Sequence, residues 1–326
     1  MQLHFTEQPS QDKISNSMMV SNCSDVIPQL WKYYLSPMYA LEFAIGSMSN
    51  LLVILGYIFC LPSWKSTNVY MFNLALSDLI FLCTLPHLSF TYAHGQSKII
   101  PALCVANRYI LHVNLYSSIL FMVWVSVDRL LVIRHPMRNH FLLTCKGSLF
   151  VSLLTWIWVN IQVIPLINFV IKDLELSEWT KCNDFGSLSE TKANLIYSLV
   201  LTITGYVIPL LALFLSSLKM VSLLLTQEQV LGTSFQRPLK IVRAAAIMFL
   251  VLYTPLHVLR NVRIASQLSE VTLSLCSKVY IEVVYIVTRP VAFAHSVVNP
   301  IFYFLMTDRF KELLQDKLRQ IRRMLT

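Results

Sequence analysis

Asn299-Pro300-Ile301-Phe302-Tyr303 closes the last apolar segment of the chain. A proline inside a membrane helix frees a backbone carbonyl, which a neighbouring polar side chain or water must then satisfy. Asn299 lies beside that break, and Tyr303 lies one helical turn further along. Apolar packing gives no reason for an asparagine, a proline and a tyrosine to share one bilayer span. The stretch therefore predicts a functional break in the last of a series of membrane helices.

The composition is that of a membrane protein. The chain has 326 residues, of which 56% are hydrophobic and 13% are charged, and its mean hydropathy is +0.60. A soluble domain carries roughly 25% charged residues. Apolar stretches of the length that spans a bilayer, about 17–25 residues, fall near residues 34–60, 67–93, 101–133, 148–169, 194–218, 241–265 and 277–305. This pattern predicts an all-α membrane protein with a seven-transmembrane helix bundle.

The predicted bundle at 33–305 lies between an N-terminal tail at 1–32 and a basic amphipathic helix and tail at 306–326. Lysine and arginine are concentrated in that tail and in the loops after the first, third and fifth spans. By the positive-inside rule, the N-terminus is expected to be extracellular and the C-terminus cytoplasmic in a plasma-membrane protein. The N-terminal tail has no signal-peptide pattern, so the first span is expected to direct insertion. The net charge of +9 follows from this bias, and it indicates anionic lipid of the bilayer as a partner and no nucleic acid.

Four of the seven cysteines are predicted to be extracellular, where disulfides persist: Cys23, Cys104, Cys182 and Cys276. Four cysteines allow three pairings, and the residues alone do not choose among them. The other cysteines lie in or near spans or on the inner side and are expected to be free: Cys60, Cys83 and Cys145. Asn22-Cys23-Ser24 is a glycosylation sequon on the predicted outer side, although it can also stay unused.

Ionisable residues inside the spans are candidates for function. Asp78 lies in the middle of the second span, where a carboxylate costs about 2.5–3.5 kcal/mol, so it is expected to face the bundle interior. Asp128-Arg129 lies at the inner end of the third span, where an interfacial pair is the alternative interpretation. The chain contains no HExxH, GxSxG or phosphate-loop motif, so no enzymatic activity and no metal site are expected.

Arg108, Arg260 and Arg289 come from three different predicted helices. At 1.5 Å per residue they lie roughly 31, 25 and 21 Å from the inner ends of those helices, in the same outer third of the bundle. His112 is four residues after Arg108 and shares its helix face. Snorkelling to lipid headgroups explains any one of these arginines. Three together suit a ligand carboxylate or phosphate that guanidinium groups hold bidentately.

Three further residues are candidates for the same outer site. Tyr39 and Tyr92 lie near the outer ends of the first two spans, either in an aromatic belt or as hydroxyl donors to the anion. Asp184 comes two residues after Cys182 and is a candidate to lie over the site. A carboxylate there would neutralise one arginine and reduce the attraction for large polyanions.

Marker residues along the chain carry a resemblance to a known family: Asn50, Asp78, Asp128-Arg129-Leu130, Trp156, Pro209, Pro255 and Asn299-Pro300-Ile301-Phe302-Tyr303. The chain resembles the rhodopsin-like (class A) G-protein-coupled receptors over about residues 34–320. The resemblance implies a cell-surface receptor that activates heterotrimeric G proteins and has a short eighth helix near Phe310. It implies signalling roles for Asp78, Asp128, Arg129, Asn299, Pro300 and Tyr303. The only cofactor that it allows is a sodium ion near Asp78.

Within that family, residues 107–116, 182–185, 257–266 and 285–290 resemble the receptors for succinate, in the branch with the nucleotide and 2-oxoglutarate receptors. The resemblance implies a small dicarboxylate ligand, succinate, with contacts from Tyr39, Tyr92, Arg108, His112, Arg260 and Arg289. It also implies the disulfides Cys104–Cys182 and Cys23–Cys276.

The chain departs from the family's pattern on the signalling side. Leu130 stands where a tyrosine usually follows Asp-Arg, Ser217 replaces a tyrosine of the fifth helix, and His295 replaces an asparagine near Asp78. These departures predict weak coupling to G proteins. Two alternatives therefore stay open: a receptor for another small anion, such as 2-oxoglutarate or a nucleotide, and a weakly signalling paralogue or decoy with the same pocket.

Overall fold

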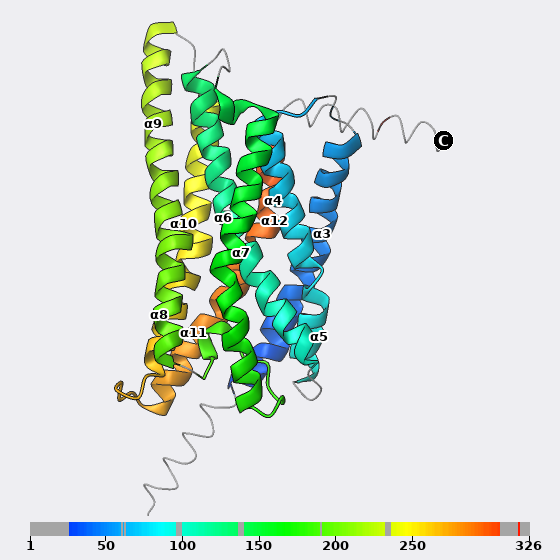
Figure 1. Ribbon diagram of the computed structural model, residues 1–326, viewed down its shortest axis with the longest axis vertical. Helices are drawn as coiled ribbons and strands as arrows, with labels where there is room; N and C mark the ends of the chain where they lie inside the picture. The colour runs from blue at the N-terminus through cyan, green and yellow to red at the C-terminus, as the bar shows by residue number, and fades with distance from the viewer. Residues whose placement is uncertain are drawn as a thin grey trace, which may run out of the picture.

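The computed structural model describes residues 26–59, 61, 63–95, 100–135, 140–189, 191–231, 236–306 and 319, without the side chains of 227–231, 236–245 and 302–306. Every regular element in these ranges is helical (Figure 1). Seven helical segments are long and apolar enough to cross a membrane. The predicted all-α, seven-helix bundle is therefore confirmed. The predicted amphipathic helix at 306–326 lies outside the described residues, apart from Met306 and Arg319.

The spans follow the chain order. The first comprises α2 (Val26–Leu30), the π-helical turn η1 (Trp31–Leu35) and α3 (Ser36–Phe59). The second comprises α4 (Ser66–Leu82) and α5 (Leu85–His94), and the third and fourth are α6 (Pro101–Arg134) and α7 (Cys145–Leu176). The fifth comprises α8 (Thr191–Thr202), η4 (Ile203–Val207) and α9 (Ile208–Leu231). The sixth belongs to α10 (Gln236–Ser266), and the seventh comprises α11 (Leu275–Phe293) and α12 (His295–Met306).

Two of the spans are interrupted, although Pro165, Pro255 and Pro300 lie inside continuous helices. Pro86 lies in the first turn of α5, and the chain turns at Cys83 and Thr84 just before it. Pro290 lies inside α11, and the helix is interrupted at Ala294 before α12 begins. A proline lacks the N–H and its ring clashes with the preceding turn, so the turn before Pro86 follows from the sequence. The interruption at Ala294 lies after Pro290 and is not explained in this way. The break at Ala294 places His295 at the start of α12.

Helix α6 forms the centre of the bundle. It packs against α4, α7 and α9, and 72% of its most apolar window is buried, compared with 33% for α7. Its buried polar residues include Arg108, His112 and Asn114. These side chains face neighbouring helices and not lipid, so α6 contributes to both polar clusters described below. We call the end of the bundle where α6 begins the disulfide end; it lies at the bottom of Figure 1.

Candidate functional site

A disulfide fixes the loop between α7 and α8 at one end of the bundle. Cys104, in the first turn of α6, is bonded to Cys182 with a Cα–Cα distance of 6.0 Å, as predicted. Asn183 donates its Nδ2 to Oδ2 of Asp173 in α7, at 3.0 Å. The loop is thus tied to two helices and brings the next residue, Asp184, beside the N-terminal part of α6.

The other cysteine predictions have separate outcomes. Cys276 is a half-cystine, but its predicted partner Cys23 lies outside the described residues, as do Cys60 and the predicted glycosylation site Asn22. Cys83 and Cys145 are free thiols, in agreement with the sequence.

The carboxylate of Asp184 lies between two arginines. Its Oδ1 is 3.1 Å from Nη1 of Arg108 and 3.4 Å from Nη2 of Arg289. Tyr285 of α11 donates its hydroxyl to Oδ2 of the same carboxylate. The sequence predicted that Asp184 would neutralise one arginine. The structure instead places it against two, because the disulfide-bonded loop reaches the gap between α6 and α11.

The charge of Asp184 is set by these neighbours. Burial alone would raise the pKa of Asp184, but Arg289 and Arg108 outweigh the burial and hold that pKa well below its usual range. The carboxylate is therefore charged at neutral pH. A ligand anion that binds Arg108 or Arg289 must therefore compete with Asp184, which already forms ion pairs with both arginines.

Arg260 of α10 is buried on the other side of this cluster, with 1% of its surface exposed. Its Nε donates to Oγ of Ser198 at 3.0 Å, its Nη1 to the hydroxyl of Tyr116 at 3.0 Å, and its Nη2 to Oγ1 of Thr202 at 3.1 Å. The guanidinium also lies 4.9 Å from the ring centroid of Phe185. All of these partners are neutral. Within the described ranges, no carboxylate forms an ion pair with Arg260.

Two small cavities meet at Asp184. The outer cavity, of about 80 Å³, is lined by Arg108 and Tyr92, and the inner cavity, of about 10 Å³, by His112 and Arg260. Asp184, Tyr285 and Arg289 line both cavities and separate them. A buried water needs roughly 10–15 Å³, so the inner cavity has room for about one water. A larger ligand reaches Arg260 only if the residues between the cavities move.

The remaining predicted contacts lie around these cavities. His112 is held by its own helix and by a ring contact, because its Nδ1 is 2.8 Å from the carbonyl oxygen of Arg108 and its ring meets Phe185 edge-on. Tyr92 accepts a hydrogen bond from Nη2 of Arg289 at 3.1 Å. Tyr39 lines neither cavity. Its ring is 6.0 Å from that of Tyr92, and its buried hydroxyl has no hydrogen-bond partner among the described residues.

Sequence reasoning missed the residues that orient the arginines. Tyr285 is four residues before Arg289 and shares its helix face, so this spacing could have identified it. Tyr116, Ser198 and Thr202 hold Arg260. Ser198 and Thr202 are also four apart on α8, but isolated hydroxyl residues are common in membrane helices, where they bond to the preceding turn, as Thr202 does to the carbonyl oxygen of Ser198.

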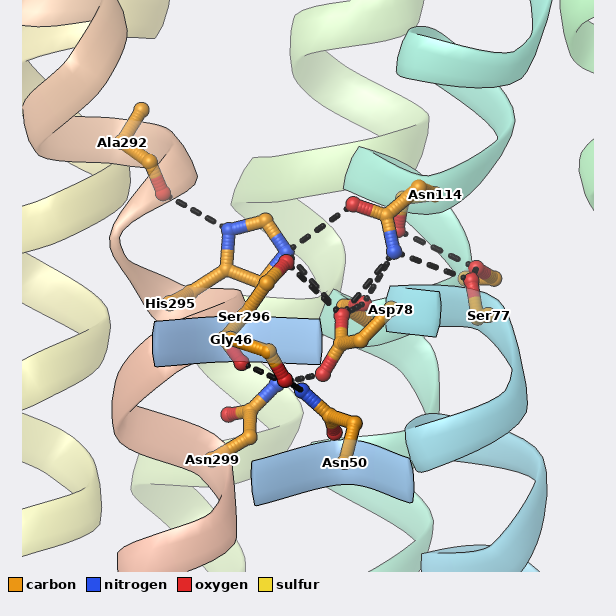
Figure 2. Close-up of polar contacts among 11 residues, drawn as sticks. Gly46, Asn50, Ser77, Asp78, Asn114, Ala292, His295, Ser296 and Asn299 are labelled. Carbon is orange, nitrogen blue, oxygen red and sulfur yellow. Dashed lines mark hydrogen bonds and ion pairs between the residues drawn. The ribbon is translucent and has the colours of Figure 1, made fainter. Parts of the chain in front are cut away.

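A second polar cluster surrounds Asp78 in the middle of the bundle (Figure 2). Asp78 has no exposed surface. Its Oδ1 accepts from Nδ2 of Asn114 at 2.9 Å, from Oγ of Ser118 at 3.2 Å and from Oγ of Ser296 at 3.0 Å. Its Oδ2 accepts from Nδ2 of Asn299 at 2.8 Å. These bonds join α4, α6 and α12, so a movement of α12 would change the hydrogen bonds of Asp78.

The other residues with predicted signalling roles lie in the C-terminal part of α6 and in α12. Asp128 accepts hydrogen bonds from the hydroxyls of Ser66 and Thr67 at the start of α4. Leu130, two residues later, packs against Met220 and Leu224 of α9. Arg129 and Pro300 lie in α6 and α12, and Tyr303 lies in α12 but its side chain is outside the described part.

Ser217 of α9 is 8% exposed, and its hydroxyl has no hydrogen-bond partner in the part of the chain that the structure describes. The residue therefore faces other helices and not lipid. The neighbouring Ser216 does reach across, because its Oγ lies 2.9 Å from Oγ of Ser126 in α6.

Comparison with known proteins agrees with this architecture. Residues 49–303 match the 7 transmembrane receptor (rhodopsin family). This chain belongs to that receptor family. Succinate receptor 1 of Rattus norvegicus is 45% identical to the receptor over 299 residues, which cover 91% of this chain and 94% of the relative. Succinate receptor 1 of Mus musculus is 43% identical over 297 residues, covering 90% and 93%. A purinoceptor of Homo sapiens is 31% identical over 295 residues, covering 89% and 79%.

These similarities confirm the predicted family. The receptor is a multi-pass membrane protein of the succinate receptor and purinoceptor type, and its relatives are receptors and not enzymes.

Proposed function

We propose that the receptor binds succinate at the disulfide end of the bundle and transmits this binding to heterotrimeric G proteins. The disulfide end faces the extracellular side in this proposal, with the N-terminus outside and the C-terminus in the cytoplasm. The positions of lysine and arginine support the orientation, as does a disulfide, which needs an oxidising compartment.

Arg260 is the observation that carries the proposal. A buried cation with only neutral partners is costly, and an anion beside it would offset that cost. Arg260 and Arg289 line the same inner cavity, so an anion there can interact with both guanidinium groups. His112 faces this cavity as well and offers its Nε2 to the ligand.

Charge and size favour a small dianion. Three arginine charges against the single carboxylate of Asp184 leave two positive charges, which a dicarboxylate matches. A second carboxylate of the same molecule can take the place of Asp184 beside Arg108 and Arg289. A nucleotide carries more charge and a bulky base, and cavities of about 80 and 10 Å³ leave less room for it. The names of the two succinate receptors among the relatives support the same choice.

The test is a binding and G-protein activation assay with a panel of C3–C6 dicarboxylates and their monocarboxylate analogues. Succinate should be preferred, and monocarboxylates should bind far more weakly. Each of the variants Arg108→Ala, Arg260→Ala and Arg289→Ala should lose at least about 2 kcal/mol of binding free energy, which raises Kd about thirtyfold. This is the scale for removing one partner of a buried charged pair. Lys192→Ala is the matched control, because this cation forms an exposed ion pair with Glu270 at the same end of the bundle. A full succinate response in Arg289→Ala would exclude the assignment.

A second candidate function is a receptor that binds the ligand but signals weakly. The buried, unpartnered hydroxyl of Ser217 and the apolar packing of Leu130 support it, because neither side chain links α6 to α9 by a hydrogen bond among the described residues. Normal ligand affinity together with low G-protein activation at equal surface expression would single out this candidate.

A further inference from the structure

His295 lies inside the cluster around Asp78, with both ring nitrogens close to oxygen atoms (Figure 2). Nδ1 is 2.7 Å from the carbonyl oxygen of Ala292. A carbonyl oxygen only accepts hydrogen bonds, so Nδ1 carries a proton. Nε2 is 3.2 Å from Oδ1 of Asn114 and 3.5 Å from Oδ1 of Asp78.

The orientation of the Asn114 amide decides the state of Nε2. Asn114 donates its Nδ2 to Asp78 at 2.9 Å and to Oγ of Ser77 at 3.1 Å. Its Oδ1 must therefore point toward His295, as the structure has it. Nε2 then faces two oxygen atoms, of the amide and of the carboxylate, and a proton on Nε2 would let it donate to them. An imidazole with a proton on each nitrogen is an imidazolium cation.

No other cation among the described residues contacts the cluster. The groups that face His295 from the neighbouring helices are Asp78 on α4, Asn114 on α6 and Tyr253 on α10, whose ring centroid is 5.2 Å from that of His295. From α3, the neutral Asn50 approaches the cluster through its bond to the carbonyl oxygen of Ser296. A positive charge on the ring would therefore have one acidic partner, the carboxyl group of Asp78, and both side chains have no exposed surface.

The family resemblance led us to expect a sodium ion near Asp78, and these residues do not fit one. Two like charges 4 Å apart repel each other by about 4 kcal/mol at an effective dielectric constant of 20. A sodium ion beside Asp78 would meet the imidazolium at such a distance.

We propose that Asp78 and His295 form a proton site, in which the imidazolium of His295 replaces sodium as the counter-ion of Asp78. The cation is then part of the chain. The stability and the ligand affinity of the receptor then depend on the proton of His295. The concentration of sodium does not change them through this site. Replacing His295 by asparagine removes the resident charge and leaves an amide oxygen, and this variant acquires sodium dependence.

The experiment compares full-length receptor in NaCl and in choline chloride at equal ionic strength. For the wild type we expect the same Tm and the same agonist Kd in both salts, within about twofold. For His295→Asn we expect sodium to raise Tm and to weaken agonist binding by about fivefold or more, the lower end of typical coupling between two sites. Equal sodium effects in the wild type and the variant would overturn the proposal.

A second measurement covers the case in which His295→Asn fails to fold. In receptor labelled with ¹⁵N-histidine, the His295 signal, assigned by its loss in His295→Gln, should show two protonated ring nitrogens at neutral pH. A ring protonated on Nδ1 alone would overturn the proposal. The sodium comparison on the wild type needs neither variant, and a sodium-dependent Tm there would also contradict it.

Discussion

A Cβ atom at Gly205 would lie 2.4 Å from Cδ1 of Tyr116. Gly205 belongs to the π-helical turn η4, and the hydroxyl of Tyr116 accepts the hydrogen bond from Nη1 of Arg260. The absence of a side chain at position 205 thus lets the Tyr116 ring pack closely against the fifth span. Gly205 does not line either cavity, but through Tyr116 it helps to hold Arg260 in place.

Gly205→Ala should therefore weaken ligand binding without changing any group that touches the ligand. The added methyl group overlaps a fully buried ring, and overpacking of this kind costs about 1–3 kcal/mol. We expect Kd for succinate to rise about tenfold and Tm to fall. Ile203→Ala in the same turn is the control, because Ile203 is 52% exposed and should leave Kd unchanged. An unaltered Kd in Gly205→Ala would show that Tyr116 does not position Arg260.

Asp184→Asn should change the preference for charge. The variant keeps the size of the side chain but leaves three uncompensated arginines in place of two. One additional positive charge within about 5 Å attracts a polyanion by roughly 3 kcal/mol at an effective dielectric constant of 20. A nucleoside diphosphate should gain affinity relative to succinate by about tenfold or more in competition binding. Glu270→Gln, an exposed acid at the same end, should leave the ratio unchanged, and an unchanged ratio in Asp184→Asn would refute the role of Asp184.

The disulfides should differ in importance. Cys104→Ala or Cys182→Ala releases the loop that carries Asp184, so ligand binding should be lost and surface expression should fall. Losing a native disulfide costs about 2–5 kcal/mol in small secreted domains, and a bundle of this size should remain partly folded. Cys23→Ala or Cys276→Ala should have a smaller effect on radioligand binding. A mass map of the wild type that shows Cys104 as a free thiol would contradict the pairing.

Ser217→Tyr should raise both basal and maximal G-protein activation. Ser217 is buried between helices without a hydrogen-bond partner among the described residues, and a tyrosine hydroxyl there can reach across to α6. One such bond is worth about 0.5–1.5 kcal/mol, which shifts a two-state equilibrium between about twofold and tenfold. Leu218→Tyr is the control, since Leu218 is 51% exposed on the lipid side. Activation is compared at matched surface expression, and no increase in Ser217→Tyr would reject the network explanation.

Most of the helical architecture could be predicted from the sequence, because uninterrupted apolar stretches in a bilayer have only one way to satisfy their backbone groups. The sequence predicts that the first span starts near residue 34, whereas the described helix already includes Val26. The reason is packing: Trp31 lies 5.9 Å from the ring of Tyr92 and extends the helix beyond the apolar core of the span. Polar residues around Trp31 concealed this extension.

The candidate site was predictable in part. Helical rise brought Arg108, Arg260 and Arg289 to one level, since their heights depend only on chain distance. The partners of each guanidinium depend on rotamers and on the path of the disulfide-bonded loop, and neither follows from spacing. For that reason the double contact of Asp184 and the neutral shell of Arg260 appear only in the structure.

Asp184 has one more consequence, for the concentrations that the receptor can sense. The carboxylate belongs to the same chain as the arginines, so its effective concentration beside them does not fall on dilution. A free ligand must compete with this carboxylate for the arginines. The apparent Kd is the intrinsic Kd divided by the fraction of molecules in which the carboxylate has withdrawn; a fraction of about 1% weakens the apparent affinity about a hundredfold. Asp173 and Tyr285, which hold the loop and its carboxylate, would then set the threshold of the response while the ligand contacts stay the same.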